Sequence, residues 1–150
     1  MTDYKLIKEQ MEALAEDEQS YIPVMANASA LLFYSMEDLN WAGFYLVRDS
    51  ALILGPFQGK VACVRIEKGK GVCGTAWKED EVQLVPDVHA FPGHIACDGD
   101  SRSEIVIPLH KDGKVAAVLD IDSPSYARFS EEDKAGLKEF AASLERIIEW

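Results

Sequence analysis

Three cysteines, Cys63, Cys73 and Cys97, are the residues of this sequence with the widest chemical scope. Their odd number argues against a framework of structural disulfides. Charged residues interrupt the first nine positions and predict no signal peptide, so we expect a cytoplasmic chain with reduced thiols. Such thiols serve catalysis, bind a metal or are buried as small apolar side chains. Cys97 is the strongest candidate for a reactive thiol, because it lies in a polar segment beside Asp98 and Asp100.

A short segment around Cys97 holds several residue types that ligate metals, namely His89, His94, Cys97 and Asp98. A structural zinc site normally draws a second ligand pair from elsewhere, and the other two cysteines form no C-x-x-C motif. We therefore expect no metal and no cofactor. A hydrolase that pairs Cys97 with one of the two histidines stays an alternative, although no oxyanion donors can be recognised in the sequence.

The run Gly69-Lys70-Gly71-Val72-Cys73-Gly74 matches the dinucleotide-binding pattern G-x-G-x-x-G. That pattern requires a parallel βαβ unit and an acidic residue about 20 positions further on, where this chain has His94 in a loop. Neither condition is met. We interpret the run as a tight turn that requires glycine backbone angles.

The composition excludes several classes of partner. The chain has 150 residues and a net charge of −11, which disfavours binding to nucleic acid and to anionic membranes. Its length and its 48% hydrophobic content are typical of one globular domain, here residues 1–150, with a core that needs no disulfides. We therefore expect the chain to bind a small molecule.

Apolar residues at helical spacing predict helices over Asp3 to Asp17, Pro23 to Met36 and Ser130 to about Glu149. The central part reads as six strands, over Trp41 to Val47, Leu52 to Phe57, Ala62 to Ile66, Val82 to Val85, Glu104 to Leu109, and Val115 to Ile121. The one long connection is Pro86 to Arg102. This order predicts an α+β fold in which terminal helices cover one face of an antiparallel sheet and the long loop covers the other.

Several runs carry a resemblance to a known family: NWAGFYL (40–46), LGPFQGKVACVRI (54–66), GKGVCGTA (69–76), VPDVHAFPGHIACD (85–98), SRSEIVIPL (101–109) and LDIDSP (119–124). Together they resemble the free methionine-(R)-sulfoxide reductases, which are GAF-domain enzymes. The match runs in order from about Asn40 to Phe129. It implies a GAF-like fold and reduction of free L-methionine-(R)-sulfoxide to L-methionine.

The resemblance also implies roles for individual residues. Cys97 matches the nucleophile that becomes a sulfenic acid, Cys63 the cysteine that resolves it as a disulfide, and Cys73 an additional redox cysteine. The residues that match the substrate-binding set are Trp41, Tyr45, Glu104, Asp120 and Asp122. Thioredoxin is the implied reductant. A homodimer stays open, as does a non-catalytic GAF module that senses a small molecule.

The residues themselves are consistent with this chemistry. Free methionine sulfoxide carries an α-ammonium, which carboxylates can bind, whereas a methionine within a polypeptide has none. We hypothesise that Asp120 and Asp122 bind the ammonium. Glu104, crowded by like charges, would have a raised pKa and donate a proton to the sulfoxide oxygen.

This hypothesis requires the three acids to share one face of the sheet. We predict a three-residue loop at Lys111-Asp112-Gly113 with a bulge, which pairs His110 with Lys114 and places Glu104 opposite Asp120. A two-residue loop with regular pairing would turn Glu104 away from both aspartates.

The walls and the cover of the site can also be predicted. Trp41 and Tyr45 are four positions apart in a strand, so they share a face and could enclose the substrate methyl group. The long loop is expected to close over the site with Asp87, Val88, His89 and Phe91.

Overall fold

The computed structural model describes residues 1–95 and 97–150, which form four α-helices, one 3-10 helix and six β-strands. The helices are α1 (Tyr4–Leu14), α2 (Tyr21–Ser35), α3 (Gly71–Glu79), the 3-10 helix η1 (Val88–Ala90) and α4 (Glu131–Ile147). The strands are β1 (Trp41–Arg48), β2 (Ala51–Gly59), β3 (Arg65–Glu67), β4 (Gln83–Val85), β5 (Ser103–Lys111) and β6 (Lys114–Ser123).

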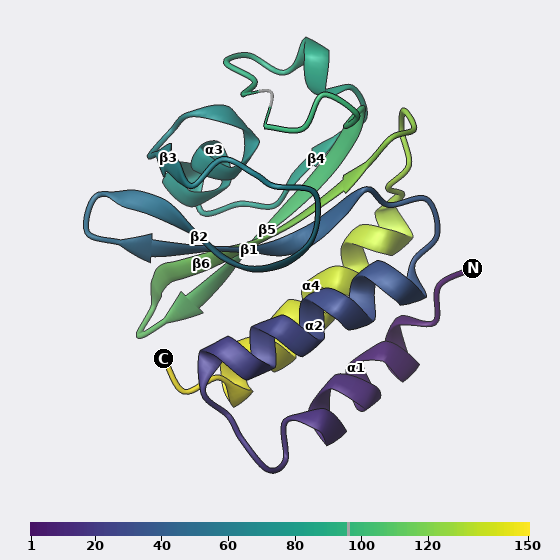
Figure 1. Cartoon of the computed structure of the whole chain (residues 1–150), viewed down its shortest axis with the longest axis vertical. Coiled ribbons are helices and arrows are strands. Elements are labelled where there is room, and N and C mark those ends of the chain that lie inside the picture. The colour runs from purple at the N-terminus through teal and green to yellow at the C-terminus, as the bar shows by residue number, and fades with distance from the viewer. Residues whose placement is uncertain (96) are drawn as a thin grey trace.

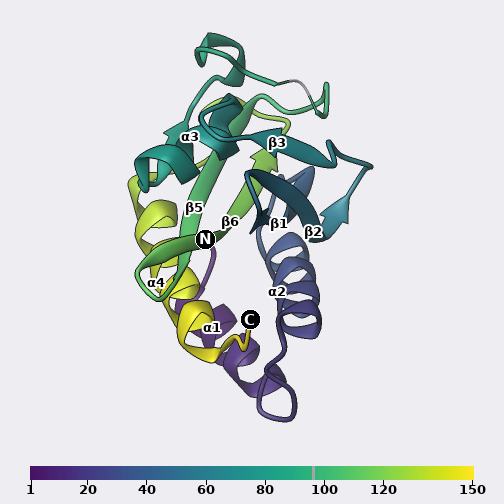
Figure 2. The ribbon, with the colours of Figure 1, turned by 90° about the vertical axis from the view of Figure 1, so that its left-hand side faces the viewer.

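One antiparallel sheet organises the molecule, with the strand order β3-β2-β1-β6-β5-β4. Figures 1 and 2 show α1, α2 and α4 together on one face of this sheet. The short helix α3 and the segment that leads from β4 to β5 lie on the other face (Figure 1). The predicted α+β architecture is thereby confirmed. Within the described residues, no helix is both long enough and apolar enough to cross a membrane.

Local sequence signals explain where the helices begin. Asp3 caps α1 by accepting a hydrogen bond from the backbone N–H of Leu6 at 3.0 Å. Ser130 and Asp133 form a reciprocal capping box at the start of α4. Pro23 lies in the first turn of α2, where its missing N–H costs no helical hydrogen bond. These caps are the ones that the sequence indicates.

The alternation of side chains along the strands separates two buried layers. On β1, Ala42 and Phe44 face the long helices and join the larger core. Trp41 and Tyr45 face the opposite side, where they pack in a smaller core with α3. Since β5 and β6 are buried on both faces, polar side chains on the α3 side of these strands are enclosed.

The β5–β6 hairpin differs from the prediction in its turn and in its pairing. Asp112 and Gly113 alone form the loop, both with positive φ (53° and 78°), and Lys111 pairs with Lys114. Two left-handed residues match the twist of a hairpin, so the two-residue turn is favoured. The predicted loop of three residues is wrong.

A bulge within the hairpin then changes the register. His110 pairs with Val115 but Leu109 pairs with Ala117, so one extra residue lies in β6. Beyond this bulge Glu104 pairs with Asp122 instead of the predicted Asp120. The three acids nevertheless share one face, which is the consequence that the hypothesis requires.

The third strand is also shorter than predicted and begins later. It spans Arg65–Glu67, whereas the predicted range began at Ala62. The Tyr45 hydroxyl donates a hydrogen bond to the Cys63 carbonyl at 2.9 Å, and the backbone N–H of Leu54 on β2 donates to the Val64 carbonyl at 3.1 Å. Cys63 therefore lies in a loop over the α3 side of the sheet.

Candidate active site

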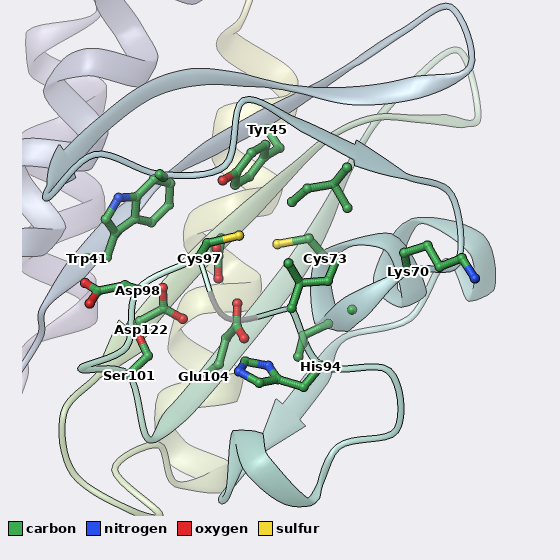
Figure 3. A pocket seen from close by; sticks show the side chains of 16 residues that line it. Trp41, Tyr45, Lys70, Cys73, His94, Cys97, Asp98, Ser101, Glu104 and Asp122 are labelled. Carbon is green, nitrogen blue, oxygen red and sulfur yellow. The ribbon is translucent and has the colours of Figure 1, made fainter.

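A pocket on the α3 side of the sheet collects most of the residues that the sequence singled out (Figure 3). The predicted residues that line it are Trp41, Tyr45, Cys73, Cys97, Glu104, Asp120 and Asp122. They come from β1, α3, β5, β6 and the long loop, so the fold joins segments that are distant in the sequence. Cys63 reaches the same place through its bond to Cys97.

Cys63 and Cys97 form a disulfide, with Cα atoms 5.3 Å apart across a sequence separation of 34 residues. Both cysteines are half-buried, and Cys97 lines the pocket. The pairing that the resemblance implied is present. The chain is thus observed in its oxidised form.

Hydrogen bonds position the two loops that carry the disulfide. The Trp41 indole Nε1–H donates to the carbonyl of Lys60 at 3.1 Å, and Lys60 Nζ donates to Asp100 Oδ2 at 2.7 Å. Asn40 Nδ2 donates to Asp98 Oδ2 at 2.9 Å and to Ser101 Oγ at 3.0 Å. The first two contacts hold the Cys63 loop, and the last two hold the Cys97 loop to the start of β1.

Three carboxyl groups form the floor of the pocket. Glu104, Asp120 and Asp122 are 8%, 6% and 9% exposed, so all three are nearly removed from water. Burial, followed by repulsion from the two aspartates, raises the pKa of Glu104 well above its usual range. Burial also raises the pKa of Asp120 and, with repulsion from Asp120, that of Asp122. The cluster therefore retains protons at a pH at which ordinary carboxyls are ionised.

Among the described residues, no cation pairs with the cluster. Among the salt bridges formed within residues 1–95 and 97–150, none involves these three acids. The buried Oδ1 of Asp120 has no hydrogen-bond partner in the described structure. An unpaired buried acceptor is unfavourable, so the arrangement favours a ligand that brings positive charge and N–H donors.

Aromatic rings form the wall of the pocket. The ring of Trp41 stacks on Tyr45 with centroids 5.9 Å apart and on Phe57 at 5.1 Å. The shared face that was predicted for Trp41 and Tyr45 is confirmed. Phe57, which supports the indole from β2, was not recognised in the sequence because an aromatic residue in a strand is indistinguishable from ordinary core packing.

Comparison with known proteins decides the family. The GAF domain family matches residues 28–149. Free methionine-R-sulfoxide reductase of Escherichia coli is 51% identical over 145 residues, which cover 97% of this chain and 88% of the relative. This chain belongs to the free methionine-R-sulfoxide reductase family. It is accordingly an oxidoreductase.

Solved structures of this reductase family agree with the assignment. The fRMsr of Staphylococcus aureus in complex with substrate has a TM-score of 0.94 and 50% identity, covering 99% of this chain and 97% of that chain. The free methionine-R-sulfoxide reductase of Neisseria meningitidis, also in complex with its substrate, has a TM-score of 0.92 and 45% identity, covering 95% and 86%. The likeness therefore extends over nearly the whole chain.

Cys73 lies deeper in the pocket than the two bonded cysteines. It is the free cysteine of the chain, 5% exposed, in the first turn of α3. Burial and the nearby carboxylates raise the pKa of its thiol well above the usual value. The glycine-rich run before it forms the predicted tight turn, with φ of 80° at Gly69 and 62° at Gly71.

The long loop covers the site with residues other than those predicted. His94, Ile95, Cys97, Asp98 and Ser101 line the pocket, and Ala96 lies outside the described residues. The four predicted cover residues, Asp87, Val88, His89 and Phe91, do not line it. Val88 is instead fully buried in the smaller core, where it anchors the beginning of the loop.

The two histidines of the loop bear on the hydrolase alternative. The rings of His89 and His94 meet edge to face with centroids 5.9 Å apart, the His89 ring lies 3.4 Å from Asp87 Oδ1, and the Cys97 sulfur is bonded to Cys63. This geometry gives no support to a Cys-His hydrolase. Asn40, Asp98 and Ser101 anchor the Cys97 loop, a role that the sequence analysis assigned to none of them, although Asn40 opens one of the motif runs of the reductase family.

Proposed function

We propose that this chain reduces free L-methionine-(R)-sulfoxide to L-methionine in the cytoplasm. The observation that supports this proposal is the juxtaposition, in one pocket, of a disulfide and three buried carboxyls that lack a cation. Family membership supports the same reaction, since the related proteins of Escherichia coli and Saccharomyces cerevisiae carry the name free methionine-R-sulfoxide reductase. A sensing module has no need for a pair of thiols that can form a bond.

The reaction begins from the reduced form, with Cys63 and Cys97 as thiols. The Cys97 thiolate attacks the sulfoxide sulfur while Glu104 donates a proton to the sulfoxide oxygen. The oxygen passes to Cys97, which becomes a sulfenic acid, and methionine leaves. The Cys63 thiol then attacks the Cys97 sulfur, releases the oxygen as water and leaves the disulfide.

Each cycle therefore consumes two thiols and yields one methionine, one water and one Cys63–Cys97 disulfide. An external dithiol must reduce that bond by thiol–disulfide exchange before the next cycle. We assign this role to thioredoxin. Cys73, the additional redox cysteine of the resemblance, is not required by either step.

The acidic floor accounts for selection of the free amino acid. Asp120 and Asp122 bind the α-ammonium, which supplies the charge and the N–H donors that Asp120 Oδ1 lacks. Ammonium binding also offsets negative charge near Cys97 and so favours its thiolate. Trp41 and Tyr45 form the wall that encloses the methyl group. An amide nitrogen at this position brings no charge and leaves buried carboxylates unpaired.

The experiment that tests the proposal uses the reduced protein without added reductant and the separated R and S epimers of free methionine sulfoxide. We expect the R epimer to yield one equivalent of methionine, measured by chromatography, and the S epimer to yield none. The Cys97→Ser variant, whose fold is checked by circular dichroism, should release none from either. Binding of both epimers without methionine release would favour a sensing module instead.

A further inference from the structure

Cys73 takes no part in the proposed reaction, yet its thiol faces the acidic floor. Its Sγ and one carboxylate oxygen each from Glu104 and Asp120 all lie within 4.8 Å of one another, and all three residues are buried. They come from α3, β5 and β6, three elements that meet only in the folded chain. Figure 3 shows Cys73 and Glu104 turned into the same pocket.

Few basic residues surround this donor set. The basic residues among those that line the pocket are Lys70 and His94. Figure 3 shows the Lys70 amino group directed away from the carboxyls. The Oδ1 atom of Asp120 is fully buried and has no partner in the described chain. This orphaned acceptor is a second observation, independent of the clustering, that points to a cationic ligand at this position.

The chemistry of the donors selects the class of cation. A thiolate with two carboxylates suits a tetrahedral, borderline-soft ion such as Zn²⁺, whereas Mg²⁺ and Ca²⁺ favour six or more oxygen ligands. Zinc bonds of about 2.3 Å to sulfur and about 2.1 Å to oxygen place neighbouring donors roughly 3.5 Å apart. Since these donors lie within 4.8 Å of one another, zinc would draw any pair together by no more than about 1.3 Å and leave its fourth position to water.

We propose that Cys73, Glu104 and Asp120 form a Zn²⁺ site that overlaps the position of the substrate ammonium. Binding releases the Cys73 thiol proton and the protons that the carboxyls share, and the metal forms one bond to sulfur and two to oxygen. Zinc and substrate then exclude one another, so the ion acts as a reversible competitive inhibitor. The competition rests on the proposed function, whereas the metal site itself does not.

The test uses the full-length oxidised protein, in which Cys63 and Cys97 are bonded and Cys73 is the free thiol. Zn²⁺ is titrated by calorimetry, and Co²⁺ serves as a spectroscopic probe. We expect one Zn²⁺ per chain and a sulfur-to-cobalt charge-transfer band. Cys73→Ser should weaken Zn²⁺ binding at least about tenfold and remove the band. The Asp98→Asn variant loses a pocket carboxylate outside the donor set, so its affinity should change far less.

Failure to bind Zn²⁺, or equal affinity in the wild type and Cys73→Ser, would overturn the site. Competition is tested separately, by repeating the titration with free methionine-(R)-sulfoxide and with its N-acetyl derivative. The free amino acid should weaken apparent Zn²⁺ affinity and the acetylated form should not. If Zn²⁺ binds through Cys73 but free substrate leaves its affinity unchanged, the overlap of the two sites and the assigned ammonium position are wrong. The reductase activity is tested separately, by methionine release.

Discussion

Glu104 on β5 lies directly opposite Asp122 on β6, and both side chains reach the same pocket as Asp120. A single extra residue in β6, close to the hairpin turn, produces this register. Without it the two-residue turn would pair Glu104 with Ile121 and direct the glutamate to the helical face. A local irregularity in one hairpin thus assembles the acidic floor.

The acidic floor reduces stability at neutral pH. The pKa of each of its carboxyls is raised in the folded state, so the folded chain binds more protons than the unfolded chain between about pH 4 and those raised values. The contribution of these groups to the free energy of unfolding is therefore fully present below about pH 4, and it is lost as the pH rises through their raised pKa values. The Asp122→Asn variant removes one of the three charges.

We expect Asp122→Asn to raise the free energy of unfolding at pH 7.5, because it removes the burial and the repulsion that raise the pKa of Asp122. The gain should shrink as the pH is lowered toward 4. Urea denaturation at several pH values measures both. Asp17→Asn, at an exposed position in the turn after α1, is the matched control and should change stability by less than about 0.5 kcal/mol. A gain that is constant with pH would contradict the electrostatic origin.

Glu104 is expected to act as the proton donor. Glu104→Gln preserves size and hydrogen bonding but cannot supply the proton, so kcat should fall about 10²- to 10⁴-fold. Because Glu104 acts in its protonated form, the wild-type rate should decline as pH rises through the raised pKa of this group. That decline should be absent in the variant. Stopped-flow measurement of methionine formation tests this, and an unchanged pH profile in Glu104→Gln would assign the proton to another group.

Recognition of the ammonium predicts strict discrimination between substrates. N-acetylation of methionine-(R)-sulfoxide removes the charge and leaves buried carboxylates unpaired, so kcat/KM should fall about 10⁴-fold. The comparison requires only the two substrates and one enzyme. Equal use of both would exclude Asp120 and Asp122 as ammonium ligands.

The ion pair between Lys60 and Asp100 links the two cysteine loops, since each residue lies three positions from a bonded cysteine. Both side chains are mostly exposed, so the pair is weak. Asp100→Asn should slow disulfide closure by up to about fivefold, with methionine release in the first turnover unchanged. Trapping of the sulfenic acid with dimedone measures closure. A charge-reversed pair, Lys60→Asp with Asp100→Lys, should restore the rate at low salt.

Much of the fold was accessible from the sequence, because capping residues and apolar periodicity act locally. Asp3, Pro23 and Ser130 begin or support helices where they were expected. Glu104 and Asp120 likewise lie in the strands predicted for them, and Asp122 lies one residue beyond the predicted end of its strand. The register of the β5–β6 pair could not be predicted from the sequence. It is set by the bulge between Leu109 and His110, which depends on pairing between the two strands.

The incorrect predictions at the site also have their cause in contacts between residues that are distant in the sequence. The segment from Ala62 to Val64 is apolar enough for a strand, but regular pairing with β2 begins only at Arg65, and the Tyr45 hydroxyl, from another strand, binds the Cys63 carbonyl. Val88 was expected over the site because its loop is long, whereas the smaller core buries it. Asn40 binds Asp98 across a sequence separation of 58 residues, and no short motif contains two residues so far apart.

Peptide mapping after one turnover tests most directly whether Cys97 takes the sulfoxide oxygen and Cys63 resolves it. Reduced protein is mixed with free methionine-(R)-sulfoxide, quenched with an alkylating agent and digested for mass spectrometry. The mechanism predicts one Cys63–Cys97 disulfide per methionine released, with Cys73 alkylated only after unfolding. In Cys63→Ser, one methionine should still form while Cys97 persists as a sulfenic acid. Methionine released with Cys97 still reduced would contradict the mechanism.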